Sequence, residues 1–214
     1  MSRNVVPDPF ALPDRAAIAQ RLARLPPLEQ LMTADDLERQ QLIGAQPLRP
    51  AAVLLLVVNR PEPTVVFTQR TTHLPDHAGQ ISFPGGRCDA GDCSPEDTAL
   101  REAREEVGID PASVQVLGRL PEYRTSTGYR VTPVVGWAEP PLEYRPDPHE
   151  VADVFEVPLA FLLDSRNHRY ESAFHRGRLR RYWALPFGER FIWGATAGML
   201  VTFHRVVVPP PAPA

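Results

Sequence analysis

The sequence predicts an α/β fold in which a mixed β-sheet lies between layers of helices. Two observations lead to this class. Apolar runs of strand length are interspersed with helical patterns along the chain. The length of 214 residues fits one domain with an appendage and suffices to bury a core. We expect an N-terminal helical extension over residues 1–48, the main domain over 49–208 and a Pro-rich tail over 209–214.

Each element in the first part of the chain has its own signal. Residues 14–25 carry apolar side chains at helical spacing and end before two prolines. Val- and Leu-rich segments separated by a Pro-Glu-Pro turn predict a buried hairpin over 51–59 and 64–68. A short strand over 81–83 then leads into a glycine turn at residues 84–86.

A helix over residues 95–107 is the most informative element. Ser94 is expected as its N-cap, Pro95 occupies the first helical position, and Gly108 supplies the stop. At about 100° per residue, three glutamates fall within an arc of roughly 100°. These glutamates are Glu102, Glu105 and Glu106. The apolar stripe roughly 120° away consists of Ala99, Leu100, Ala103 and Val107. One face of the helix can therefore pack while the other presents carboxylates.

The remaining elements follow from apolar runs and alternation. The predicted strands after the helix cover 114–120, 131–137, 151–157, 170–174 and 179–185. A helix is expected over 158–163, and a final helix over 195–204 follows the apolar segment 191–194.

The three glutamates form a candidate cation site. Crowded carboxylates repel one another unless a hard cation such as Mg²⁺ or Mn²⁺ neutralises them. The alternative is a solvated helix face with ion pairs, because Arg101 lies four residues before Glu105. An ordinary surface helix does not need the glycine turn that precedes this one. We therefore favour a site that holds a polyphosphate through a metal, with Arg101 positioning Glu105.

Residues 86–109 resemble the Nudix box, G-x(5)-E-x(7)-R-E-U-x-E-E-x-G-U, where U is a bulky aliphatic residue. This box is the signature of hydrolases of nucleoside diphosphates linked to another moiety. Residues 101–109 match its second half, with Ala103 in an aliphatic slot. The first half departs from it, because Asp92 replaces the first glutamate and one extra residue precedes Arg101. Residues 68–86 are similar to the upstream signature of the coenzyme A pyrophosphatase branch, which tolerates both departures.

The resemblance implies a Nudix-type α/β/α sandwich with a mixed β-sheet. It also implies that the first and last glutamates, Glu102 and Glu106, are the principal metal ligands. Glu105 would be a further ligand or would orient water, and Mg²⁺ or Mn²⁺ would be the cofactor. Gly85 and Gly86 would allow the backbone to approach metal or phosphate closely.

Residues outside the box complete the expected site. Arg70 can hold a phosphate through paired donors, with a structural salt bridge as the alternative. Glu150 is the candidate general base, and a charge that protects a strand edge is equally consistent with its position. His77 and Tyr129 are candidates for substrate binding, although an exposed loop histidine or a plain surface turn would explain them too. The arginines between residues 166 and 190 could meet an extra phosphate or form a solvated ribbon.

Composition and charge exclude several classes of binding partner and of reaction chemistry. The 23 basic residues, all arginine, oppose 26 acidic ones for a net charge of -3, without the basic stripe of nucleic-acid-binding proteins. The absence of lysine excludes a Schiff base and a Walker-type lysine. We expect no signal peptide and no membrane span, hence a cytoplasmic location with Cys88 and Cys93 as free thiols. A zinc site that joins these cysteines to His73 and His77 is disfavoured by Pro75.

The combined expectation is a divalent-metal-dependent hydrolase of the diphosphate in coenzyme A or its thioesters. Alternatives within the enzyme class act on ADP-ribose, NADH, another dinucleotide or a nucleoside triphosphate. An alternative from another class is a nucleotide-binding regulator without catalysis. The presence of all three glutamates argues for catalysis. A monomer and a homodimer both remain open.

Overall fold

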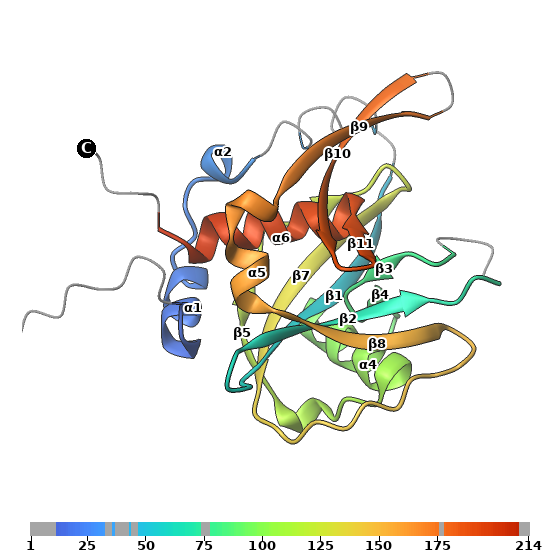
Figure 1. Ribbon diagram of the computed structural model, residues 1–214. Coiled ribbons are helices and arrows are strands. Elements are labelled where there is room, and N and C mark those ends of the chain that lie inside the picture. Colours follow the sequence, from blue (N-terminus) through green and yellow to red (C-terminus); the bar gives the residue numbers. More distant parts are fainter. Residues whose placement is uncertain are drawn as a thin grey trace, which may run out of the picture.

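The structure is a computed structural model, and it describes residues 12–32, 36, 43, 47–73, 78–175 and 178–209. Figure 1 shows the arrangement of its elements. The helices are α1 (Arg15–Leu22), α2 (Leu28–Leu31), α4 (Pro95–Val107), α5 (Leu159–Leu163) and α6 (Gly194–Val207), with 3-10 turns at Pro111–Ser113 and Ser165–Asn167. The strands are β1 (Arg49–Val58), β2 (Thr64–Arg70), β3 (Ile81–Ser82), β4 (Gly85–Arg87), β5 (Val114–Arg119), β6 (Tyr123–Arg124), β7 (Tyr129–Ala138), β8 (Val151–Pro158), β9 (Arg169–His175), β10 (Arg178–Phe187) and β11 (Arg190–Trp193).

The main sheet is mixed, as predicted. Its strand order is β3-β2-β1-β7-β5, while β4 pairs with β1, β6 with β7 and β8 with β2. β1 and β7 run parallel along their whole length, from Arg49 opposite Tyr129 to Val58 opposite Ala138. The other pairings among the described strands are antiparallel. Strands β9, β10 and β11 form a second, smaller sheet.

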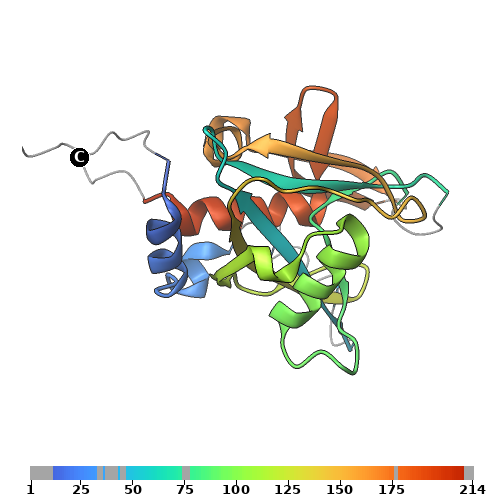
Figure 2. The same cartoon turned by 90° about the horizontal axis from the view of Figure 1, so that it is seen from below.

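The central strand β1 is apolar on both faces because helices cover both sides of the sheet. Leu55 and Val57 belong to the core that α6 completes, whereas Leu54 and Leu56 belong to the core beneath α4. Figure 2 shows α4 and α6 on opposite sides of the strands. The predicted α/β/α sandwich is therefore confirmed. The N-terminal helix α1 lies against β5 and α6 and adds Ile18 and Leu22 to the first of these cores, the one that α6 completes.

Most predicted elements are present with shifted ends. α4 begins and ends where the caps predict, with Ser94 accepting a hydrogen bond from the Asp97 amide and Gly108 in the left-handed region at φ 74°. The first helix stops at Leu22, short of residue 25, and the last helix extends to Val207. No helix in the described parts of the chain is long and apolar enough to cross a membrane.

The predicted glycine turn at residues 84–86 is wrong in part. The chain bends at Pro84, but Gly85 and Gly86 already belong to strand β4, opposite Val53 and Ala52 of β1. A turn was expected because glycine commonly marks one. Here the glycines are needed because neighbouring atoms leave no room for a side chain, as the candidate site makes plain.

Candidate active site

The glutamates of α4 differ in their surroundings because the helix packs along β1 and β4. The Glu106 side chain is 8% exposed, that of Glu102 is 18% exposed and that of Glu105 is 60% exposed. Glu106 Oε2 accepts a hydrogen bond from the backbone amide of Gly85 at 3.0 Å. Two of the three predicted carboxylates therefore point toward β4, and the third lies on the solvent side.

The two glycines of β4 allow this close packing. A Cβ atom on Gly86 would lie 2.4 Å from Cδ of Glu102, and one on Gly85 would lie 2.4 Å from the carbonyl oxygen of Ala52. Gly85 also has φ 151°, which disfavours other residues. The backbone of β4 thus approaches the carboxylates as closely as only glycine permits.

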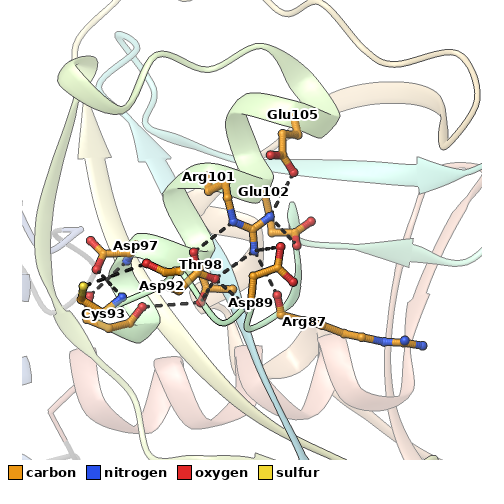
Figure 3. Close-up of polar contacts among 11 residues, drawn as sticks. Arg87, Asp89, Asp92, Cys93, Asp97, Thr98, Arg101, Glu102 and Glu105 are labelled. Atoms are coloured by element: carbon orange, nitrogen blue, oxygen red, sulfur yellow. Dashed lines mark hydrogen bonds and ion pairs between the residues drawn. The ribbon is translucent and has the colours of Figure 1, made fainter.

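Arg101 links the helix to the loop before it, as Figure 3 shows. Its guanidinium donates to Glu102 and to Glu105 at 3.0 Å each. It also donates to both carboxylate oxygens of Asp92, at 3.1 and 2.9 Å, and to the carbonyl oxygen of Arg87 at 3.1 Å. Arg101 therefore lies where a positioning residue for Glu102 and Glu105 would lie.

Asp92 has hydrogen-bond partners that the sequence did not predict. Hydrogen bonds from Arg101, from the Asp89 amide and from the Thr98 hydroxyl hold the pKa of Asp92 well below its usual range. Its carboxylate is satisfied by these donors. The aspartate at the place of the box's first glutamate thus ties the loop to α4.

Glu106 and Glu102 have fewer donors than Asp92, and the effect of burial outweighs those donors. Burial raises the pKa of Glu106 to about 7, with the Gly85 amide and Arg70 acting in the opposite direction and Glu102 and Glu150 adding to the rise. Burial also raises the pKa of Glu102, against its ion pair with Arg101. These carboxylates share one region of negative potential that a cation would stabilise.

Arg70 and Glu150 reach the same region from other elements. Arg70 Nη1, at the end of β2, lies 3.9 Å from Glu106 Oε1 and 4.0 Å from Glu150 Oε2. The loop that carries Glu150 is fixed by backbone hydrogen bonds. The Asp147 amide donates to the Glu106 carbonyl, and the Thr71 amide donates to the Glu150 carbonyl. Residues separated by 80 positions in the sequence are therefore neighbours at one end of α4.

Tyr129 lies on another strand of the main sheet. It begins β7, and its hydroxyl accepts a hydrogen bond from Arg87 Nε at 2.9 Å. Arg87 is the last residue of β4, directly after Gly86. His77 lies outside the described residues. The sequence did not single out Arg87, although its place next to the glycines was a usable signal.

The donor set fits a divalent cation that is completed by substrate. Within the described residues, no three His, Cys, Asp or Glu side chains are gathered into a group that could hold a metal ion by themselves. Mg²⁺ usually binds through one or two carboxylates together with substrate phosphates and water. Glu102 and Glu106 supply carboxylates of that kind. Cys88 and Cys93 are free thiols, as expected.

Comparisons with known proteins agree on one family. Residues 47–177 match the family described as NUDIX domain. A protein of Shigella flexneri serotype 5b (strain 8401), named "Uncharacterized Nudix hydrolase NudL", is 47% identical over 176 residues, which cover 79% of this chain and 92% of that protein. The protein with the same name from Escherichia coli (strain K12) is 46% identical over the same shares of both chains.

Solved structures in the comparison have lower similarity. A Nudix hydrolase from M. smegmatis, RenU, has a TM-score of 0.46 at 25% identity and covers 56% of this chain and 74% of its own. A MutT/nudix family protein from Enterococcus faecalis has a TM-score of 0.47 at 16% identity and covers 92% of this chain and 76% of its own.

Proposed function

The chain belongs to the Nudix domain family, and from that premise we propose that it hydrolyses the diphosphate of coenzyme A or its thioesters. The products would be 4'-phosphopantetheine, free or acylated, and adenosine 3',5'-bisphosphate. The observation that carries this proposal is that residues of two sequence motifs, the upstream signature and the Nudix box, lie next to each other in the structure. Arg70 belongs to the upstream signature and lies 3.9 Å from Glu106 of the Nudix helix.

In this proposal the carboxylates of α4 have different roles. Glu102 and Glu106 would hold Mg²⁺ or Mn²⁺, and Glu105 would be a further ligand or would orient water. A bound divalent ion would cancel charge on the diphosphate oxygens and activate water. Arg101 positions Glu102 and Glu105 through its two 3.0 Å hydrogen bonds. The undercompensated burial of Glu106 supports a ligand role, because an isolated buried charge is costly.

The substrate contacts come from the surrounding elements. Arg70 binds the diphosphate, since its guanidinium lies between Glu106 and Glu150 at the same end of α4. Gly85 and Gly86 would let the backbone of β4 approach metal or phosphate closely beside the carboxylates. Glu150 serves as the general base, because its half-exposed carboxylate lies beside Arg70 on a loop fixed by backbone hydrogen bonds. His77 and Tyr129 complete the proposed substrate-binding set.

The cellular setting belongs to the same proposal. We place the enzyme in the cytoplasm, where its free thiols Cys88 and Cys93 stay reduced. Both a monomer and a homodimer are compatible with a site built from one chain.

A substrate screen tests the proposal directly. Coenzyme A, acyl derivatives, ADP-ribose and NADH would be incubated with the enzyme and Mg²⁺ or Mn²⁺, and the products identified by mass spectrometry. We expect the highest kcat/KM for coenzyme A or a thioester, with cleavage at the diphosphate. Preference for ADP-ribose or NADH would overturn the coenzyme A assignment and leave the family assignment intact. Absence of turnover on every substrate would favour a nucleotide-binding regulator.

A further inference from the structure

Two arginines meet at one tyrosine next to the candidate active site. The guanidinium carbon of Arg49 lies 4.3 Å from the ring centre of Tyr129, and that of Arg87 lies 5.6 Å from it. Arg87 also donates its Nε–H to the Tyr129 hydroxyl at 2.9 Å. We call Arg49, Arg87 and Tyr129 the arginine cluster. Its members come from the first residues of β1 and β7 and the last residue of β4.

The cluster places two exposed arginines on one tyrosine ring. In the part of the chain that the structure describes, neither Arg49 nor Arg87 forms an ion pair with a carboxylate. Stacking of guanidinium groups on a tyrosine face is favourable, but it leaves their charge uncompensated. Both side chains are exposed, so their outward N–H groups are available to a ligand. Planar guanidinium groups bind phosphate through paired hydrogen bonds.

The backbone of the cluster is coupled to the carboxylate site. The Arg87 carbonyl accepts a hydrogen bond from Arg101, and Gly86, one residue earlier, abuts Glu102. Figure 3 shows that the Arg87 side chain extends away from the carboxylates. Among the described strands β4 pairs only with β1, so no strand covers its second edge. A ligand that lies across this edge can contact both the carboxylates and the arginine cluster.

Arg70 is poorly placed for a second phosphate. Its guanidinium lies between two carboxylates of the candidate site, which suits the diphosphate that is cleaved. In coenzyme A only the ribose and its 5'-carbon separate the diphosphate from the 3'-phosphate. A separate cationic site one strand residue beyond Gly86 therefore suits the second group.

We infer that the arginine cluster binds a phosphate monoester of the substrate, namely the 3'-phosphate on the adenosine half of coenzyme A. This inference rests on the proposed function and adds the residues that discriminate coenzyme A from ADP-ribose. Arg87 and Arg49 contact the phosphate. Tyr129 is a positioning residue that orients Arg87 through its hydroxyl and Arg49 through its ring.

Kinetics with matched substrates test the inference. For the wild type we expect kcat/KM to be roughly 10- to 100-fold higher for coenzyme A than for dephospho-coenzyme A, the size of a charged hydrogen-bond contribution. Arg87→Ala and Arg49→Ala should remove most of that ratio by lowering kcat/KM for coenzyme A alone. Arg87→Lys should restore part of it, and Tyr129→Phe should lower it to an intermediate value. Arg24→Ala, at an exposed arginine just after α1, is the control and should keep the wild-type ratio.

A binding measurement separates this inference from the proposed function. Calorimetry should show that the wild type binds adenosine 3',5'-bisphosphate more tightly than AMP. Arg87→Ala should bind these two ligands with equal affinity. This result would support the cluster even if another diphosphate were the best substrate. Equal losses on coenzyme A and dephospho-coenzyme A in Arg87→Ala, or an unchanged preference for the bisphosphate, would overturn the inference while leaving coenzyme A hydrolysis intact.

Discussion

Two glutamates of this protein, Glu106 on α4 and Glu156 on β8, are largely buried in very different ways. Glu156 accepts hydrogen bonds from Arg60 at 2.7 and 3.2 Å, from Tyr144 at 2.6 Å and from Thr64. Glu106 has the Gly85 amide at 3.0 Å, with Arg70 only within 3.9 Å. One carboxylate is satisfied by the protein, and the other is left short of positive partners.

The pKa values express this difference. Burial by itself raises the pKa of Glu156, but donors led by Arg60 outweigh it and lower the pKa to about 2. Burial raises the pKa of Glu106 to about 7 because its donors do not outweigh it. A buried acid with a complete set of donors stabilises the fold. A buried acid without one is better explained by a cation that joins it in function.

The largest effect that we expect from this comparison is a loss of catalysis when Glu106 or Glu102 is replaced. Glu106→Gln and Glu102→Gln keep the shape of the side chain and remove the charge that binds the metal. We expect kcat/KM to fall by about 100-fold or more, since even residues that only support a metal ligand contribute about 10- to 100-fold. Steady-state assays at saturating Mg²⁺ measure this loss, and melting curves should show an intact fold. Near-normal turnover in both variants would remove α4 from the metal site.

Glu156→Gln should behave in the opposite way. The ionised Glu156 stabilises the fold fully above its ordinary pKa of 4.5, and that stabilisation is lost as the pH falls toward about 2. The variant should therefore lose about 3 kcal/mol of unfolding free energy at neutral pH and converge with the wild type near pH 2. Urea denaturation over a pH series measures this. Turnover per folded molecule should stay unchanged, and a variant as stable as the wild type at pH 7 would contradict the assignment.

Arg101→Ala should have a smaller effect, and it concerns both the metal site and the hydrogen bonds of Asp92. The substitution removes the donors that hold Glu102 and Glu105 and leaves Asp92 with fewer partners. We expect metal affinity to fall about 10-fold, as for other residues that orient metal ligands. Activity measured against Mg²⁺ concentration reports this affinity. An unchanged half-saturating concentration would show that Arg101 has only a structural role.

Local signals in the sequence predicted α4 well. Its cap, its proline, its glycine stop and its stripe of alanines depend on residues within one helix, so spacing alone is informative. The same spacing could not show that Glu105 stays exposed while Glu106 is buried. That difference depends on how α4 packs against β4.

Contacts between distant residues were the part that the sequence could not predict. Gly85 and Gly86 suggested a turn, whereas their pairing with Ala52 and Val53 makes them a strand. The partners of Asp92 and the meeting of Arg49 with Arg87 likewise depend on strand register. The place of Glu150 beside a strand predicts a role for it, but only the contacts of its loop show that it lies next to Arg70.

Mn²⁺ binding is the most direct test of the central claim, that the undercompensated carboxylates of α4 hold a divalent cation. Calorimetric titration would compare the wild type with Glu106→Gln and Glu156→Gln at a pH where all three are folded. We expect at least about 10-fold weaker Mn²⁺ binding in Glu106→Gln. Glu156→Gln should bind as the wild type does. Equal Mn²⁺ affinity in the wild type and Glu106→Gln would contradict the account.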